Sequence, residues 1–166
     1  MNDYFPFSEH VEYRQYKRSD KEQVRLLHEI ALKATDAYAK PGVWDSDLDD
    51  IEKHYIDNGG EFIVGLIKNE VVAMGAYKPV SESAAEIKRM RVRPDLQGKG
   101  IGKILLTMLE ESIENKGYLR IVLDTTVNQK AARHLYETNG YKEVRREIEG
   151  WPLEMIYYQK DLISCY

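Results

Sequence analysis

Cysteine is nearly absent from the sequence, which contains a single one, Cys165. One thiol cannot form an internal disulfide, and nothing around it has the spacing of a metal site, so we predict a reducing compartment and no metal. Long apolar runs are also missing, since no segment approaches the roughly 20 apolar residues that cross a bilayer. Residues 1–10, MNDYFPFSEH, have no basic start followed by an apolar run, so no secretory signal is predicted there. These absences favour a cytoplasmic protein.

An excess of positive charge is lacking as well. The formal net charge is −4, so the sequence gives no reason to expect nucleic acid as a partner. Hydrophobic residues make up 43% and charged residues 31%, which is the balance of a folded globular chain. Repeats, low-complexity segments and linkers are also absent. We therefore predict a single domain over residues 1–166, with residues 1–10 as a loose N-terminal arm.

Hydrophobic periodicity predicts the order β-α-α-β-β-β-α-β-α-β-β, which indicates an α/β fold with a mixed sheet. Helices are expected over residues 19–38, from residue 46, over 101–113 and over 130–140. Strands are expected over residues 11–17, 61–67, 71–77, 85–92, 118–124, near 144 and over 155–162. Ser19 and Glu22 have the spacing of a capping box at the start of the first helix. Leu48, Ile51 and Tyr55 should face inward from the second helix.

The strand expected over residues 85–92 has imperfect alternation. Ile87 lies on one parity, whereas Met90 and Val92 lie on the other. A bulge, which adds one residue to one of two paired strands, would reconcile the two parities. We predict this bulge between Lys88 and Met90.

The stretch RPDLQGKGIGKILL places Gly98, Gly100 and Gly102 on alternate positions between a strand and a helix. The first N–H groups of a helix have no partner within it, and the helix dipole favours negative charge there. Glycine lets the backbone approach a ligand closely, and Lys99 and Lys103 add positive charge. The stretch therefore predicts a phosphate or pyrophosphate site. The alternative is that the glycines only permit a tight connection between strand and helix.

Two common phosphate motifs do not fit this stretch. The dinucleotide fingerprint is G-x-G-x-x-G, whereas the spacing here is G-x-G-x-G. The P-loop needs serine or threonine after its glycine and lysine, but Ile104 follows Lys103. A nucleotide-binding protein is therefore only a third choice.

The same residues resemble the acetyl-CoA-binding signature of the GNAT superfamily of N-acetyltransferases, (Q/R)-x-x-G-x-(G/A). Gln97, Gly100 and Gly102 fill its three places. A second block, NQKAARHLYETNGY, is similar to the later family motif N-x-x-A-x-x-L-Y-x-x-x-G-F, with Ala132 in the alanine place and Tyr141 for phenylalanine. The resemblance implies the GNAT fold, a mixed central sheet of about six to seven strands flanked by about four helices.

The resemblance also implies acetyl-CoA as co-substrate. The implied cofactor-binding residues are Met90, Arg91, Val92, Gln97, Gly98, Lys99, Gly100, Ile101, Gly102, Lys103, Asn128, Ala131 and Tyr136. The backbone of Met90 and Val92 would bind the pantetheine arm, and residues 97–103 would wrap the pyrophosphate with their N–H groups. Asn128 would reach the pantetheine through its amide; the alternative is that it caps the following helix.

Direct attack of an amine on the acetyl carbon is the implied chemistry. The Met90 N–H would stabilise the oxyanion, a contribution of about 2.7–4 kcal/mol for such a donor. Tyr136 would protonate the leaving thiolate, unless it only packs against the sheet. An alkyl ammonium, with a pKa of about 10.4, must first lose a proton. Glu86 is the candidate base, directly or through water; the alternative is a solvated residue or one paired with Lys88 or Arg89.

The family recognises its acceptor through the first two helices and the loop before the last strand. The first region contains Tyr38, Trp44, Asp45, Asp47, Asp49, Asp50 and Glu52. Aromatic and acidic residues would suit a cationic amine, but acids at a helix start also favour the dipole in a solvated position. Trp151 and Pro152 would line the acceptor pocket or cover the core. The four histidines, His10, His28, His54 and His134, lack ligand spacing and are expected at the surface or packed.

The sequence thus predicts an acetyl-CoA-dependent N-acetyltransferase. Its acceptor is expected to be the primary amine of a small molecule, with a peptide or protein amine as the second choice. The alternative from another class is a module that senses acetyl-CoA without turnover. Because family members are often dimers, a homodimer is expected, with no nucleic-acid or membrane partner.

Overall fold

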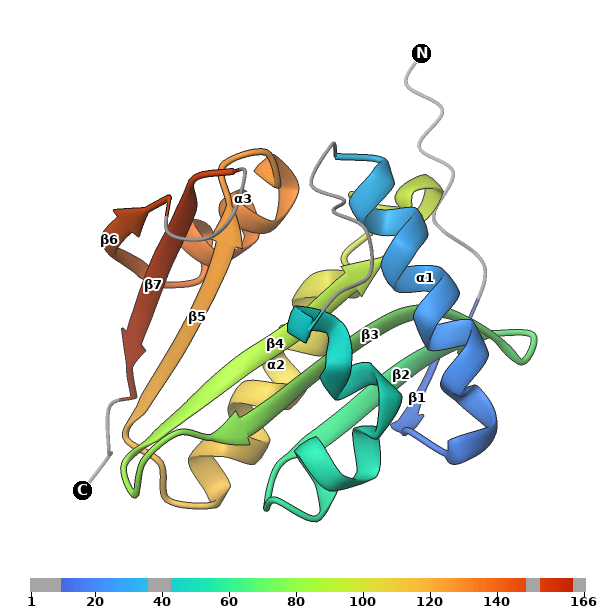
Figure 1. The fold of residues 1–166 in the computed structure, drawn as a ribbon, viewed down its shortest axis with the longest axis horizontal. Coiled ribbons are helices and arrows are strands. Elements are labelled where there is room, and N and C mark those ends of the chain that lie inside the picture. Colours follow the sequence, from blue (N-terminus) through green and yellow to red (C-terminus); the bar gives the residue numbers. More distant parts are fainter. Residues whose placement is uncertain (1–9, 36–42, 149–152, 163–166) are drawn as a thin grey trace.

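The computed structural model describes residues 10–35, 43–148 and 153–162. Its centre is a seven-stranded sheet in the order β1-β2-β3-β4-β5-β7-β6 (Figure 1). The strands are β1 (Glu12–Gln15), β2 (Glu61–Ile67), β3 (Glu70–Pro79), β4 (Ala84–Val92), β5 (Arg120–Thr126), β6 (Lys142–Glu147) and β7 (Met155–Asp161). Neighbouring strands are antiparallel except β4 and β5, which are parallel. The predicted α/β fold with a mixed sheet is confirmed.

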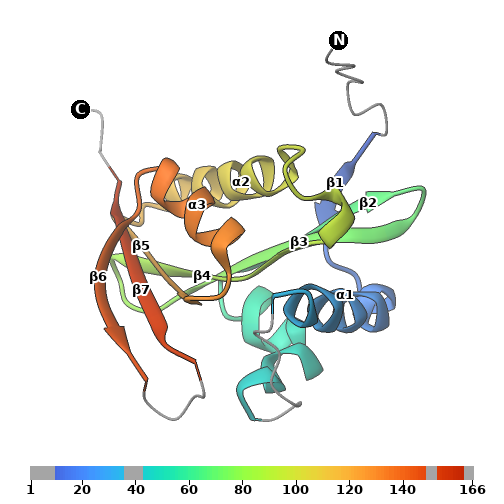
Figure 2. The same cartoon turned by 90° about the horizontal axis from the view of Figure 1, so that it is seen from above.

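Helices cover both faces of this sheet. The longer ones are α1 (Lys21–Lys33), α2 (Ile101–Asn115) and α3 (Lys130–Thr138). Shorter 3-10 turns are η1 (Arg18–Asp20), η2 (Val43–Asp49) and η4 (Pro94–Leu96), and η3 (Glu52–Ile56) is a π-helical turn. Figure 2 shows α1, η2 and η3 on one face and α2 and α3 on the other. No helix in the described ranges is long and apolar enough to cross a membrane.

The core divides between the two faces. Under α2 and α3 it includes Leu105 and Ile121, and under α1 it includes Val24 and Phe62, all of them fully buried. Burial of one such side chain contributes roughly 1.5–3 kcal/mol. The second predicted helix is wrong in type, because two short turns, η2 and η3, replace one α-helix. Its predicted inward residues Leu48, Ile51 and Tyr55 are nevertheless buried.

The start of α1 differs from the predicted capping box. Ser19 lies inside η1, and α1 begins at Lys21. The buried Asp20 carboxylate instead accepts the Lys17 N–H at 2.8 Å and pairs with Arg14 at 2.7 Å. α1 ends at Lys33, before the predicted residue 38, and the predicted stop at Pro41 and Gly42 lies outside the described residues.

A bulge interrupts β4 where the sequence predicts it. The register of β4 against β3 places Arg89 and Met90 together opposite Gly75. Arg89 has a φ of +60°, in the left-handed region that a β-strand avoids. A Cβ at Gly75 would lie 2.6 Å from the Met90 sulfur, so glycine here leaves room for the Met90 side chain. The predicted bulge between Lys88 and Met90 is confirmed.

β4 and β5 pair only near their starts. Residues Ala84 to Glu86 pair with Arg120 to Val122, and the pairing between these two described strands ends there. Beyond this point the two strands diverge, as Figure 1 shows. Among the described strands, the C-terminal half of β4, which contains Met90 and Val92, therefore has no partner on its β5 side.

Candidate active site

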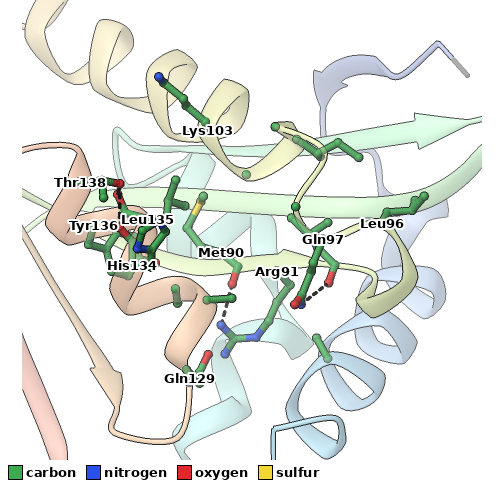
Figure 3. Close-up of a pocket in the computed structure, with 18 of the residues that line it drawn as sticks. Met90, Arg91, Leu96, Gln97, Lys103, Gln129, His134, Leu135, Tyr136 and Thr138 are labelled. Carbon is green, nitrogen blue, oxygen red and sulfur yellow. Dashed lines mark hydrogen bonds between the residues drawn. The ribbon is translucent and has the colours of Figure 1, made fainter. Parts of the chain in front are cut away.

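A cavity of about 380 Å³ opens where β4 and β5 diverge (Figure 3). Its walls come from the end of β4, the turn before α2, the start of α2, and α3. The predicted residues found in the walls are Met90, Arg91, Val92, Gln97, Gly98, Gly100, Ile101, Gly102, Lys103, Ala131 and Tyr136. The structure therefore brings together residues from both sequence motifs. Three predicted residues, Glu86, Lys99 and Asn128, lie outside these walls.

The glycine turn forms one end of the cavity with bare backbone. Gly98 and Gly100 have φ values of +78° and +85°, which favour glycine. A Cβ built on either of them would meet no atom within 4 Å, so the space above the turn is open. At Gly102 a Cβ would touch the Leu135 side chain at 3.4 Å, because α3 packs close to α2 there. This open cradle can accept a phosphate group.

The start of α2 supplies hydrogen-bond donors to the same place. Gly100 is the N-cap and has no side chain to satisfy them. The first helical bond runs from the Ile104 N–H to the Gly100 carbonyl at 3.1 Å. In the described chain the N–H groups of Ile101 and Gly102 donate to no carbonyl. The helix dipole and these free N–H groups make the turn an anion site.

Gln97 supports this turn through its side chain. Its amide nitrogen donates to the Val92 carbonyl at 3.3 Å, which links the turn to the end of β4. The backbone of residues 98–103 is thereby held beside the free edge of β4.

Tyr136 stands in α3 at the other end of the cavity. Its side chain is only 4% exposed and packs against the rings of Tyr141 and Tyr158, with centroids 5.7 and 6.1 Å away. Burial raises the pKa of Tyr136 to about 12, against the opposing effect of Arg91. Tyr136 is therefore a neutral hydroxyl at physiological pH, able to donate a proton.

Gln129, and not Asn128, enters the cavity wall. Placing Ala132 at the alanine of the family motif puts Gln129 three residues before it, where the motif has asparagine. The structure also makes Gln129 the N-cap of α3, without a side-chain cap bond, so the alternative capping role of Asn128 is not formed either. The assignment of Asn128 was therefore one residue out of register with Ala132.

Glu86 lies on β4 just before the strands diverge. Desolvation raises its pKa, the nearby Asp124 adds to the rise, and Lys88 opposes it. Among the described residues no ion pair is formed between Glu86 and Lys88 or Arg89, so that alternative is not observed. A carboxylate with a raised pKa suits a general base.

Asp124 is a candidate that the sequence analysis missed. It lies on β5, and its neighbour Leu123 is buried toward α2 and α3. Ile87 is buried on that side as well, so Asp124 and Glu86 share the opposite face of the sheet. Partial desolvation in this region raises the pKa of Asp124. Alternation along the two strands was the signal that could have paired these carboxylates.

In the acidic segment before β2, Asp45 and Asp47 match neither alternative, a site for a cationic amine or a solvated helix start. Arg89 donates through Nε to Asp47 at 2.9 Å and through Nη1 to Asp45 at 3.2 Å. Tyr55 donates to Asp47, and His28 lies 3.1 Å from Asp45. These partners, Arg89 above all, hold the pKa of Asp47 below its usual range against desolvation. The two acids are therefore compensated inside the protein.

Other residues considered for the acceptor site, and the histidines, lie as follows. Asp49 pairs with Arg25, and Glu52 pairs with Arg18, both at the surface. His28 is packed as expected, whereas His134 lies in the cavity wall. Four predicted acceptor residues, Tyr38, the Trp44 side chain, Trp151 and Pro152, lie outside what the structure describes.

Solved structures share this architecture. A GNAT-family acetyltransferase from Staphylococcus aureus Mu50 superposes with a TM-score of 0.85 at 21% identity, over 93% of this chain and 100% of that one. The PaiA N-acetyltransferase from Thermoplasma acidophilum, solved in complex with coenzyme A, superposes with a TM-score of 0.74 at 20% identity, over 92% and 99%. At these identities the likeness establishes the fold, which is that of the GNAT acetyltransferases.

The family model of the acetyltransferase (GNAT) family matches residues 24–141, and the chain belongs to this family. The Escherichia coli K12 N-acetyltransferase YjgM is 32% identical over 119 residues, 70% of each chain. The N-acetylaspartate synthetases of Danio rerio and Xenopus tropicalis are 32% and 37% identical, over 69% and 60% of this chain but only 44% and 37% of theirs. The chain thus spans less than half of each synthetase. The predicted acyltransferase class is the class of this family.

Proposed function

We propose that the protein transfers an acetyl group from acetyl-CoA to the primary amine of a small molecule. The observation that carries this proposal is the open glycine turn, which faces the same cavity as the free half of β4 and Tyr136. The likeness to PaiA N-acetyltransferase in complex with coenzyme A supports a coenzyme A site in this fold. The residues present fit such a ligand, because a diphosphate needs donors and space, and the turn provides both.

In this proposal each part of acetyl-CoA lies against its own wall of the cavity. The backbone of residues 97–103 holds the diphosphate. The pantetheine arm follows the edge of β4 at Met90 and Val92, which β5 leaves unpaired. The acetyl end then lies toward Tyr136, in the wall formed by α3.

The reaction on this arrangement is a direct displacement. Glu86, directly or through water, takes a proton from the ammonium of the acceptor. The amine nitrogen forms a bond to the acetyl carbon, and the Met90 N–H stabilises the oxyanion. The carbon–sulfur bond breaks, and the thiolate takes the hydroxyl proton of Tyr136. The nitrogen loses its second proton to solvent and the tyrosinate recovers a proton from solvent, which leaves a neutral amide and free coenzyme A.

Release of free thiol from acetyl-CoA in the presence of an amine panel tests this proposal. Acceptor-dependent thiol release, together with the mass of the acetylated product, supports the enzyme. Tight coenzyme A binding without thiol release from any acceptor supports the alternative sensor instead. A thermal-shift comparison of coenzyme A with NAD and ATP tests the third choice, a nucleotide-binding protein.

A further inference from the structure

Arg91 places a positive charge in the cavity wall without a counter-ion. Its Nη1 donates to the Met90 carbonyl at 2.8 Å, and this is its only hydrogen bond to the described residues. Its Nε is buried and has no hydrogen-bond partner. Within the described ranges no carboxylate lies at ion-pair distance from Arg91, whereas Arg89 pairs with both Asp45 and Asp47.

This arrangement is unusual for a charged side chain. Buried charges in proteins are paired as a rule, because desolvation otherwise disfavours the charged form. Desolvation lowers the pKa of Arg91 to about 10, and the neighbouring Arg89 acts in the same direction. Arg91 remains protonated at neutral pH even so. Among the described residues the guanidinium therefore lacks a counter-charge, and its buried Nε lacks an acceptor atom.

The charged groups around Arg91 do not fill this gap. Asp45, from the segment before β2, is already shared by Arg89 and His28. Asp124 on β5 and Tyr136 on α3 influence Arg91 only at longer range. Among the described residues no group supplies the missing counter-charge, whereas a ligand in the cavity would supply it.

Arg91 lies on the face of the sheet away from the core of α2. The Met90 side chain packs toward Gly75 and Leu109, and the next residue along a strand points to the opposite face. In Figure 3 the Arg91 guanidinium extends from β4 toward Gln129, whereas the glycine turn begins beyond Gln97. Ala31 of α1 and Thr35, two residues past its end, also line the cavity. The position is separate from the donors at the start of α2.

We propose that Arg91 binds a carboxylate of the acceptor, so that the acceptors are amino acids or other amino-carboxylates. This inference rests on the proposed acetyl transfer. A carboxylate supplies both the missing charge and planar acceptor oxygens that match the guanidinium fork. Bound there, it holds the acceptor amine in the same cavity as Tyr136, which the acetyl end approaches. The alternative anion, a phosphate of coenzyme A, is an outcome of the test.

Binding and turnover are measured on matched acceptors: phenylalanine with phenethylamine, and leucine with isopentylamine. Binding uses protein loaded with coenzyme A, which cannot transfer a group, and turnover uses acetyl-CoA. We expect the amino acids to bind and react at least about 30-fold better than the amines, as a charge-assisted pair predicts. Arg91→Met should remove this advantage, mainly through KM, and Arg91→Lys should restore part of it.

Three results would overturn the inference. The wild-type protein could bind the amines as well as the amino acids, or Arg91→Met could weaken both alike. Arg91→Met could also weaken coenzyme A itself, which would assign the guanidinium to a phosphate. Amino acid binding without thiol release from any acceptor would overturn the proposed transfer and still support the carboxylate site.

Arg120→Met is the matched control. Arg120 pairs with Asp161 at the surface, at the start of β5 and away from the cavity. The Arg120→Met substitution removes the same charge from a neighbouring strand. Because Arg120 lies away from the cavity, acceptor binding should stay unchanged.

Discussion

The glycine turn and Arg91 both offer positive charge to the cavity, but by different means. At the turn the donors belong to the backbone at the start of α2, and glycines keep the space above them open. At Arg91 the donor is a side chain, and its isolation depends on Arg89 having taken the nearby acids. The turn is thus a local site, whereas the acceptor end depends on contacts between distant segments. Substitutions at the turn or at the other end of the cavity test this difference.

The largest effect is expected from Gly100→Glu. The change adds a negative charge at a φ of +85°, in the open space that we propose for the diphosphate. We expect coenzyme A binding to fall below detection by calorimetry. Gly117→Glu is the matched control, because Gly117 has a φ of +89° and equally open surroundings at the opposite end of α2. Normal binding by Gly100→Glu would mean that the diphosphate lies elsewhere.

Arg89→Met should cost the most stability. It leaves the Asp45 and Asp47 carboxylates partly buried without their main cation, a change typically worth about 3–5 kcal/mol. Urea unfolding monitored by circular dichroism measures the loss. Arg146→Met, which breaks the surface pair with Glu143, should cost only about 0–1 kcal/mol. Similar losses in both variants would show that the network around Arg89 contributes little.

Tyr136→Phe should lower turnover by about 100-fold or more, because it removes the hydroxyl that we propose as proton donor to the thiolate. Affinity for acetyl-CoA should stay nearly intact, since the ring and its packing against Tyr141 and Tyr158 are kept. Steady-state kinetics with calorimetry separates the two effects. Unchanged turnover would remove Tyr136 from the acid role and leave it as a packing residue.

The smallest effect is expected in the pH profile. Glu86 must be ionised to act as base, and its pKa is raised, so kcat/KM should fall as pH falls through this raised value. Glu86→Gln should remove that limb and reduce the rate at neutral pH by about 10-fold or more. The profile is recorded for both proteins with one acceptor, so that the ionisation of the acceptor cancels. An identical limb in Glu86→Gln would assign it to another group, with Asp124 as the nearest candidate.

The local sequence pattern was sufficient to predict the central strands and the bulge that precedes the glycine turn. The β2–β3 hairpin lies within a few residues of its predicted bounds, and the parity change before Met90 located the bulge. The second helix was wrong because Leu48, Ile51 and Tyr55 face inward from a 3-10 and a π turn as well as from an α-helix. Burial pattern alone does not distinguish these backbones.

The acceptor end could not be predicted in the same way. The sequence left Asp45 and Asp47 open between a cation site and a solvated helix start, because their partner, Arg89, is more than forty residues away in sequence. The placement of Glu86 and Asp124 on one face of the sheet likewise depends on β4 and β5 being neighbouring strands. Whether a charged side chain is paired or available to a ligand depends on partners that only the tertiary fold brings near. Whether backbone N–H groups are available depends on the local turn alone.

The short pairing between β4 and β5 has a consequence for the whole molecule. Three residue pairs join one block of strands, β1 to β4, to the other, β5 to β7, and the rest of that seam carries no ladder. An acetyl-CoA molecule lying in the seam would bridge both blocks and act as a structural joint. At a ligand concentration a hundredfold above Kd, binding would add about 2.7 kcal/mol to the free energy of unfolding. The melting temperature would rise accordingly. The lifetime of the folded chain would then follow the supply of its own co-substrate.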